Sequence, residues 1–119
     1  MARIIIIDDD DILRETLAGV LTEAGHTVAT TANGFEGVAL FRAEPADLIL
    51  TDLVMPHGGL PTIRVLRSEF PQLAIIAMSG GGKSRLDIAG SLGASRTLAK
   101  PFTAKELTDA VAEVLSHQH

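Results

Sequence analysis

The sequence contains no cysteine, tryptophan or tyrosine, and only four phenylalanines among its 119 residues. Without cysteine there can be neither a disulfide nor a thiolate metal site, and the composition says nothing about the redox state of a compartment. Hydrophobic residues still make up 46% of the chain, so the core must be mainly aliphatic. This length and composition predict one domain that comprises residues 1–119.

Long apolar runs and an excess of positive charge are also lacking. No apolar run approaches the roughly 20 residues that a membrane-spanning helix needs, and the opening MARIIIIDDDD is too short and too acidic for a signal peptide. The formal net charge of −5 argues against non-specific binding to nucleic acid or to anionic membranes. We therefore expect a cytoplasmic protein that binds neither DNA nor membrane directly.

Apolar runs of strand length alternate with segments of helical periodicity along the chain. The expected strands cover residues 4–7, 26–32, 47–52, 73–79 and 95–100. A helical segment follows each strand, and the last begins with a capping box, Thr103-Ala104-Lys105-Glu106. This alternation predicts an α/β fold, (βα)5, with a doubly wound parallel five-stranded sheet and helices on both faces.

Polar side chains follow four of the five expected strands. The first strand ends in Asp8 and Asp9, the third in Asp52, the fourth in Ser79 and the fifth in Lys100. In an open parallel sheet, ligands bind beyond the carboxyl ends of the strands. Three carboxylates, a hydroxyl and an ammonium would therefore share one edge of the sheet.

This set of groups suits the transfer of a phosphoryl group. Neighbouring carboxylates repel one another, so either their pKa values rise or a cation compensates. Donors that are all oxygen, without histidine or cysteine, favour Mg²⁺ over Zn²⁺. Such a metal neutralises charge on a moving phosphoryl group, a carboxylate can be the nucleophile, and lysine and serine can bind the phosphoryl oxygens.

Four short segments carry a family resemblance: IIIIDDDD, LILTDLVMP, AMSG and LAKPF, each at the end of an expected strand. In this order and at this spacing, the sequence resembles the receiver domain of response regulators, the phosphoacceptor module of two-component signalling. The resemblance covers essentially the whole chain. It implies the flavodoxin-like strand order 2-1-3-4-5 and Mg²⁺ as the cofactor.

The resemblance also implies a metal site and a phosphoacceptor. Asp52 would accept the phosphoryl group and contribute to the metal site. Asp9 would ligate Mg²⁺ directly, and Asp8 would assist through water. The backbone carbonyl of Val54 would be a further ligand.

Two more residues match the family in the strands that follow. Ser79 would be the switch hydroxyl that moves toward the phosphoryl oxygens. Lys100 would pair with Asp52 before transfer and with the phosphoryl group afterwards. The donor would be a phosphohistidine on a histidine kinase or a histidine phosphotransfer protein.

The sequence departs from the family pattern at three places. The switch position three residues before Lys100, usually aromatic, is Thr97, so the usual coupling between the aromatic residue and the Ser79 hydroxyl is in question. The stretch GGGKS is unusually rich in glycine and predicts a mobile loop with a short or poorly ordered fourth helix near residues 83–92. The stretch MPHGGLP predicts an irregular start to the third helix.

The favoured hypothesis is a phosphorylation-controlled switch that phosphorylates and dephosphorylates itself, rather than an enzyme with a turnover substrate. Output would pass through protein contacts at the fourth helix, fifth strand and fifth helix, where some receivers also form homodimers on phosphorylation. A degenerate receiver used as a binding module is one alternative. A Mg²⁺-dependent phosphatase of the haloacid-dehalogenase type is another, although that class usually has a second Asp where this sequence has Val54.

Overall fold

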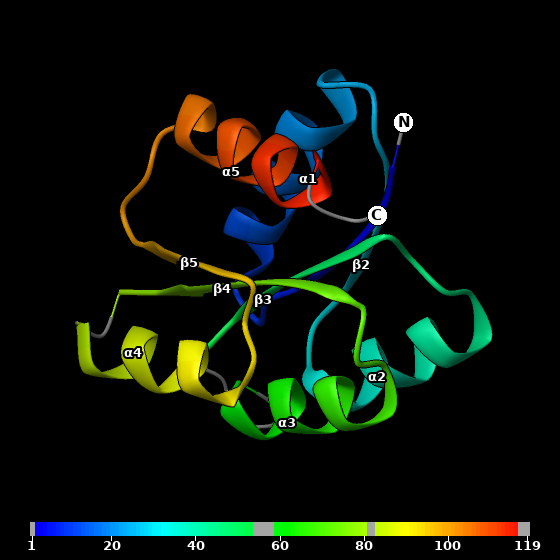
Figure 1. Ribbon diagram of the computed structural model, residues 1–119. Coiled ribbons are helices and arrows are strands. Elements are labelled where there is room, and N and C mark those ends of the chain that lie inside the picture. The colour runs from blue at the N-terminus through cyan, green and yellow to red at the C-terminus, as the bar shows by residue number, and fades with distance from the viewer. Residues whose placement is uncertain (1, 54–58, 81–82, 117–119) are drawn as a thin grey trace.

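The computed structural model describes residues 2–53, 59–80 and 83–116 (Figure 1). In these ranges five strands form one parallel sheet in the order β2-β1-β3-β4-β5. They are β1 (Arg3–Ile7), β2 (Thr27–Thr31), β3 (Leu48–Asp52), β4 (Ala74–Ser79) and β5 (Arg96–Ala99). The predicted fold class and strand order are confirmed, and no strand end differs from the expected one by more than one residue.

Helices cover both faces of the sheet, as Figure 1 shows. The helices α1 (Asp11–Glu23) and α5 (Ala104–Ser116) lie on one face. The helices α2 (Gly34–Ala43), α3 (Leu60–Glu69) and α4 (Lys83–Leu92) lie on the other. None of the helices within the described ranges is long and apolar enough to cross a lipid bilayer.

The central strands are apolar on both faces because helices cover both. One layer of the core lies between the sheet and α1 and α5 and includes Ile4, Ile6, Leu50 and Ile76. The other lies beneath α2, α3 and α4 and includes Ile5, Ile7, Ile49 and Ile75. Burying one such side chain contributes about 1.5–3 kcal/mol relative to exposure, so the sheet is a rigid base for the residues that follow its strands.

Local signals at the helix ends agree with the structure. The Thr103 hydroxyl accepts a hydrogen bond from the Glu106 N–H at 3.0 Å, and the Glu106 carboxylate accepts one from the Thr103 N–H at 3.1 Å. The predicted capping box is therefore confirmed. Asp10 caps α1 with a single side-chain bond, because its carboxylate accepts a hydrogen bond from the N–H of Leu13.

The two unusual segments lie partly outside the described residues. Residues 54–58 and 81–82, on which much of the expectation for MPHGGLP and GGGKS falls, are among those not described. The helix α3 begins after Gly59, which has φ of 70° and gives no side-chain cap. The helix α4 spans the ten residues expected from the sequence and equals α2 and α3 in length, so the prediction of a short fourth helix is wrong.

Candidate functional site

The polar residues at the carboxyl ends of β1, β3, β4 and β5 follow adjacent strands. Ile7 pairs with Thr51 across β1 and β3, so Asp8 and Asp52 occupy the next positions along the two strands. Ser79 pairs with Ala99 across β4 and β5, so Lys100 comes directly after that pair. The sheet register therefore places all of these residues along one edge.

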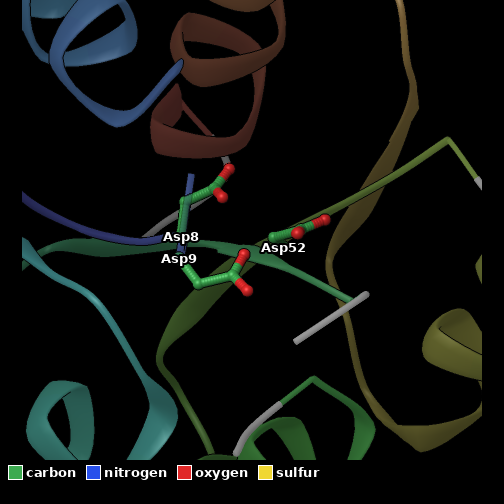
Figure 2. A group of neighbouring side chains, drawn as sticks. All are labelled: Asp8, Asp9 and Asp52. Carbon is green, nitrogen blue, oxygen red and sulfur yellow. The ribbon is translucent and has the colours of Figure 1, made fainter. Parts of the chain in front are cut away.

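Three carboxylates converge at this edge. Oxygen atoms of Asp8, Asp9 and Asp52 all lie within 4.8 Å of one another. Figure 2 shows Asp8 and Asp9 extending from the end of β1 toward the side on which Asp52 lies. Asp8 is fully buried and Asp52 is only 4% exposed, whereas Asp9 is open to solvent. This cluster therefore joins two desolvated carboxylates to one that solvent can reach.

The ammonium of Lys100 lies against both buried carboxylates. Its Nζ atom is 3.2 Å from Asp52 Oδ1 and 3.5 Å from Asp8 Oδ2. Among these four side chains, three carboxylates face one ammonium, so negative charge remains in excess when all are ionised. Burial raises the pKa of Asp8, and the backbone N–H of Asp10 and the charge of Lys100 offset only part of that rise.

This site has the arrangement of a known family. The family model of the response regulator receiver domain matches residues 4–112. The chain belongs to this family. The predicted membership is confirmed, and with it the assignment to two-component signalling.

Relatives of this receiver domain include larger regulators. The chain is 37% identical to the DNA-binding transcriptional regulator NtrC of Azospirillum brasilense over 117 residues, which are 97% of this chain and 24% of that protein. It is 34% identical to the response regulator MprA of Mycobacterium ulcerans over 88% of this chain and 46% of that protein. The receiver domain therefore spans less than half of the length of these relatives.

Solved receiver structures have the same fold. A CheY-like receiver domain protein from Methanospirillum hungatei superposes with a TM-score of 0.94 and 25% identity, over 99% of this chain and 96% of that one. A receiver domain protein from Clostridium thermocellum superposes with a TM-score of 0.91 and 28% identity, over 98% of this chain and 95% of that one.

The residues of this receiver domain fit a divalent cation. The Lys100 ammonium stands 3.5 Å from the buried Oδ2 atom of Asp8, but within the described part of the chain this oxygen has no hydrogen-bond partner. A buried carboxylate oxygen without such a partner is costly, and a cation between it and the oxygens of Asp9 and Asp52 would compensate that cost. The donors are all oxygen, as hard cations such as Mg²⁺ prefer. The Val54 carbonyl, predicted as a further ligand, lies outside the described residues.

The two predicted switch residues of the receiver domain lie on neighbouring strands. Ser79 is almost fully buried at the end of β4, and its carbonyl accepts a hydrogen bond from the Lys100 N–H at 2.9 Å. Thr97 is half-buried in β5, where it pairs with Ala77. Ser79 thus ends β4, the strand beside the one that ends in Asp52. Thr97 lies inside β5, farther from this edge of the sheet.

Sequence reasoning missed one residue of this edge. The guanidinium of Arg14 donates a hydrogen bond to the Asp8 backbone carbonyl at 2.7 Å and another to the Asp11 carboxylate at 2.6 Å. The available signal was its spacing, because residues three apart on a helix are neighbours and a cation there faces the acidic run. Arg14 thus links the end of β1 to the first turn of α1.

Proposed function

We propose that this receiver domain is a phosphorylation-controlled signalling switch whose phosphoacceptor is Asp52. The phosphoryl donor is a phosphohistidine on a histidine kinase or a histidine phosphotransfer protein. The observation that carries the proposal is the position of Asp52, which is nearly buried, 3.2 Å from the Lys100 ammonium and within 4.8 Å of two further carboxylates.

Asp52 is the best nucleophile of the three carboxylates. Asp8 already accepts a hydrogen bond from the Asp10 N–H at 2.9 Å, and its carboxyl group is fully buried. Asp9 is exposed to solvent, and hydration weakens a carboxylate nucleophile. Asp52 is largely desolvated, and Lys100 orients its Oδ1 atom.

In the proposed transfer, one bond to phosphorus forms and one bond to phosphorus breaks. An oxygen of Asp52 forms a bond to phosphorus, the donor's nitrogen–phosphorus bond breaks, and the electron pair of that bond stays on the leaving nitrogen. Lys100, released from its contact with Asp52, pairs with an oxygen of the transferred group. The hydroxyl of Ser79, the last residue of β4, donates a hydrogen bond to another phosphoryl oxygen.

Asp8, Asp9 and Asp52 would hold Mg²⁺ at this site. When bound, the ion neutralises negative charge on the phosphoryl group during transfer. The chain's own contribution is to keep the three carboxylates close together on adjacent strand ends, and to supply the Lys100 ammonium beside the acceptor and Asp8.

The acyl phosphate on Asp52 is the signal in this proposal, and its slow hydrolysis resets the protein, so there is no separate turnover substrate. Output passes through protein contact at the surface of α4, β5 and α5, either to a separate protein or to another part of a longer chain. Two phosphorylated copies pair through the same surface. The location that we propose for this function is the cytoplasm.

The test is a phosphorylation assay with acetyl phosphate and Mg²⁺, read by intact-protein mass spectrometry. We expect one phosphoryl group per wild-type chain, none on the isosteric variant Asp52→Asn, and one on the matched control Asp87→Asn, whose exposed side chain lies on α4. Repeated turnover of a small phosphate ester would instead indicate a phosphatase. The absence of any adduct on the wild type would indicate a degenerate receiver that only binds a partner.

A further inference from the structure

Arg14 makes one contact, with the backbone carbonyl of Asp8, that its place in the helix does not explain. It lies in the first turns of α1, which begins at Asp11, and the dipole of a helix disfavours a cation near its N-terminus. Its side chain is nevertheless only 16% exposed. Its two hydrogen bonds run back toward the strand end, to the Asp8 carbonyl and to the Asp11 carboxylate.

The hydrogen bond from Arg14 to the Asp8 carbonyl restrains the main chain of Asp8 and Asp9, two of the proposed metal ligands. That carbonyl belongs to the peptide group that joins Asp8 to Asp9, so holding its oxygen fixes the plane of the peptide and the direction in which both side chains leave the main chain. The Asp8 carboxylate is held independently, because its Oδ1 accepts from the Asp10 N–H at 2.9 Å. One guanidinium and one backbone N–H thus fix the turn from both sides.

The turn needs such a restraint because of its charge. Residues 8–11 are four consecutive aspartates, and their mutual repulsion favours open conformations in which the carboxylates of Asp8 and Asp9 diverge. A planar guanidinium has donors that point in fixed directions and can engage two acceptors at once. Arg14 bridges the first and the last aspartate of the run, which opposes that divergence.

We infer that Arg14 is a positioning residue for the metal site: by holding the Asp8–Asp9 peptide group, it keeps both carboxylates directed toward Asp52 and so raises the affinity for a divalent cation. This inference rests on the proposed function, since it assumes that Asp8 and Asp9 bind Mg²⁺. Arg14 itself contacts neither the ion nor the phosphoryl group.

A simple charge effect predicts the opposite result, which makes the inference testable. If Arg14 acted only through its positive charge, it would repel Mg²⁺, and removal of the charge would tighten binding. If it acts by positioning, removal of the guanidinium weakens binding despite the gain in negative charge. The sign of the change therefore separates the two roles.

The experiment measures Mg²⁺ affinity by isothermal titration calorimetry, because the chain has no tryptophan to report binding. The variants are Arg14→Met and Arg14→Lys, and the control is Arg42→Met, which removes the same charge from a surface pair with Glu69 on α2 and α3. We expect Arg14→Met to bind about tenfold more weakly, Arg14→Lys to lie between it and the wild type, and Arg42→Met to equal the wild type. Equal or tighter binding by Arg14→Met would overturn the inference.

A second measurement separates positioning from general destabilisation. The rate of phosphorylation by acetyl phosphate is measured as a function of Mg²⁺ concentration for each variant that has a wild-type circular dichroism spectrum. We expect Arg14→Met to need about tenfold more Mg²⁺ for half of its maximal rate and to reach nearly the wild-type rate at saturation. A lowered maximal rate with unchanged Mg²⁺ dependence would overturn the inference, whereas a wild type that binds no Mg²⁺ would overturn the proposed function as well.

Discussion

The ammonium of Lys100 lies 3.2 Å from Asp52 Oδ1, although β5 and β3 are not neighbours in the sheet. The strand β4 separates them, so this contact passes over its carboxyl end, which Ser79 occupies. The acceptor carboxylate, the hydroxyl and the ammonium therefore come from three successive strands. A phosphoryl group on Asp52 would enter the space that Lys100 now spans.

Replacement of Lys100 by methionine should have opposite effects on metal binding and on chemistry. The ammonium opposes a cation at Asp8 and Asp52, so its removal should tighten Mg²⁺ binding, as measured by calorimetry. It also leaves those two buried carboxylates without their positive partner, which should lower the metal-free unfolding free energy by about 1–3 kcal/mol. Phosphorylation should slow by about 100-fold or more, because a charged group aimed at the phosphoryl oxygens is lost.

The variant Lys100→Arg is the matched control for charge. It keeps the positive charge, so it should keep most of the metal-free stability. It replaces the compact ammonium, which lies between the carboxylates of Asp8 and Asp52, by a planar guanidinium. Weaker Mg²⁺ binding by Lys100→Met would contradict the view that this lysine and the cation compete for the same carboxylates.

Asp8→Asn should stabilise the metal-free protein at neutral pH, because burial raises the pKa of Asp8 and an ionised carboxylate there is costly. The folded protein holds a proton on Asp8 more tightly than the unfolded chain does. The contribution of this group to stability is therefore complete below the ordinary carboxyl pKa and is lost as the pH rises through the raised value in the folded state. Urea unfolding at a series of pH values should show this decline in the wild type and a flatter profile in the variant.

The same substitution should impair metal binding, because the amide of asparagine supplies no negative charge. Asp8→Asn should bind Mg²⁺ more weakly than the wild type, whereas Asp11→Asn, an exposed position in the same run, should change the affinity less. A destabilised Asp8→Asn protein at neutral pH would show that Lys100 compensates the buried charge fully.

The capping box of α5 should contribute measurably to stability. Thr103→Ala removes the acceptor of the Glu106 N–H, and loss of such a cap costs about 1 kcal/mol. The matched change Thr108→Ala in the same helix removes a hydroxyl that donates to the carbonyl of Lys105 and caps no helix end, so its effect should be smaller. Thermal unfolding of the two variants provides the comparison, and equal losses would refute the special role of the cap.

The sequence was sufficient to predict the elements and the positions of the polar edge. Runs such as Ile4–Ile7 are apolar because both faces of the strand are covered, and that pattern is local enough to be seen without coordinates. Once the strands are parallel, their carboxyl ends must share an edge, so Asp8, Asp52 and Lys100 were expected close together and lie so. Their chemical roles stay predictions.

Other contacts depend on tertiary structure, and the sequence holds little signal for them. The spacing of Arg14 from Asp11 is a local signal for that ion pair, but no local pattern indicates the hydrogen bond from Arg14 to the Asp8 carbonyl. The same holds for Arg67, which reaches a residue that is 26 positions away. The family pattern named the acceptor and its neighbours, but it did not indicate which cations fix the surrounding main chain.

Arg67 should be important for stability and unimportant for phosphorylation. Its guanidinium donates hydrogen bonds to the carbonyls of Gly93, Phe70 and Pro71 at distances of 2.7–3.3 Å, and burial lowers its pKa. These carbonyls precede β4 and β5, so they lie at the amino edge of the sheet, opposite the candidate site. Arg67→Met leaves them without this donor and should lower the unfolding free energy by about 1–3 kcal/mol.

The variant Arg64→Met is the control, because it removes an exposed arginine from the same helix and should change stability little. Urea unfolding measures the difference, and acetyl phosphate assays well below the unfolding transition should give both variants the wild-type rate of phosphorylation. A slowed rate in Arg67→Met alone would mean that the amino edge of the sheet is coupled to Asp52. Equal stability of the two variants would mean that water replaces the guanidinium at these carbonyls without cost.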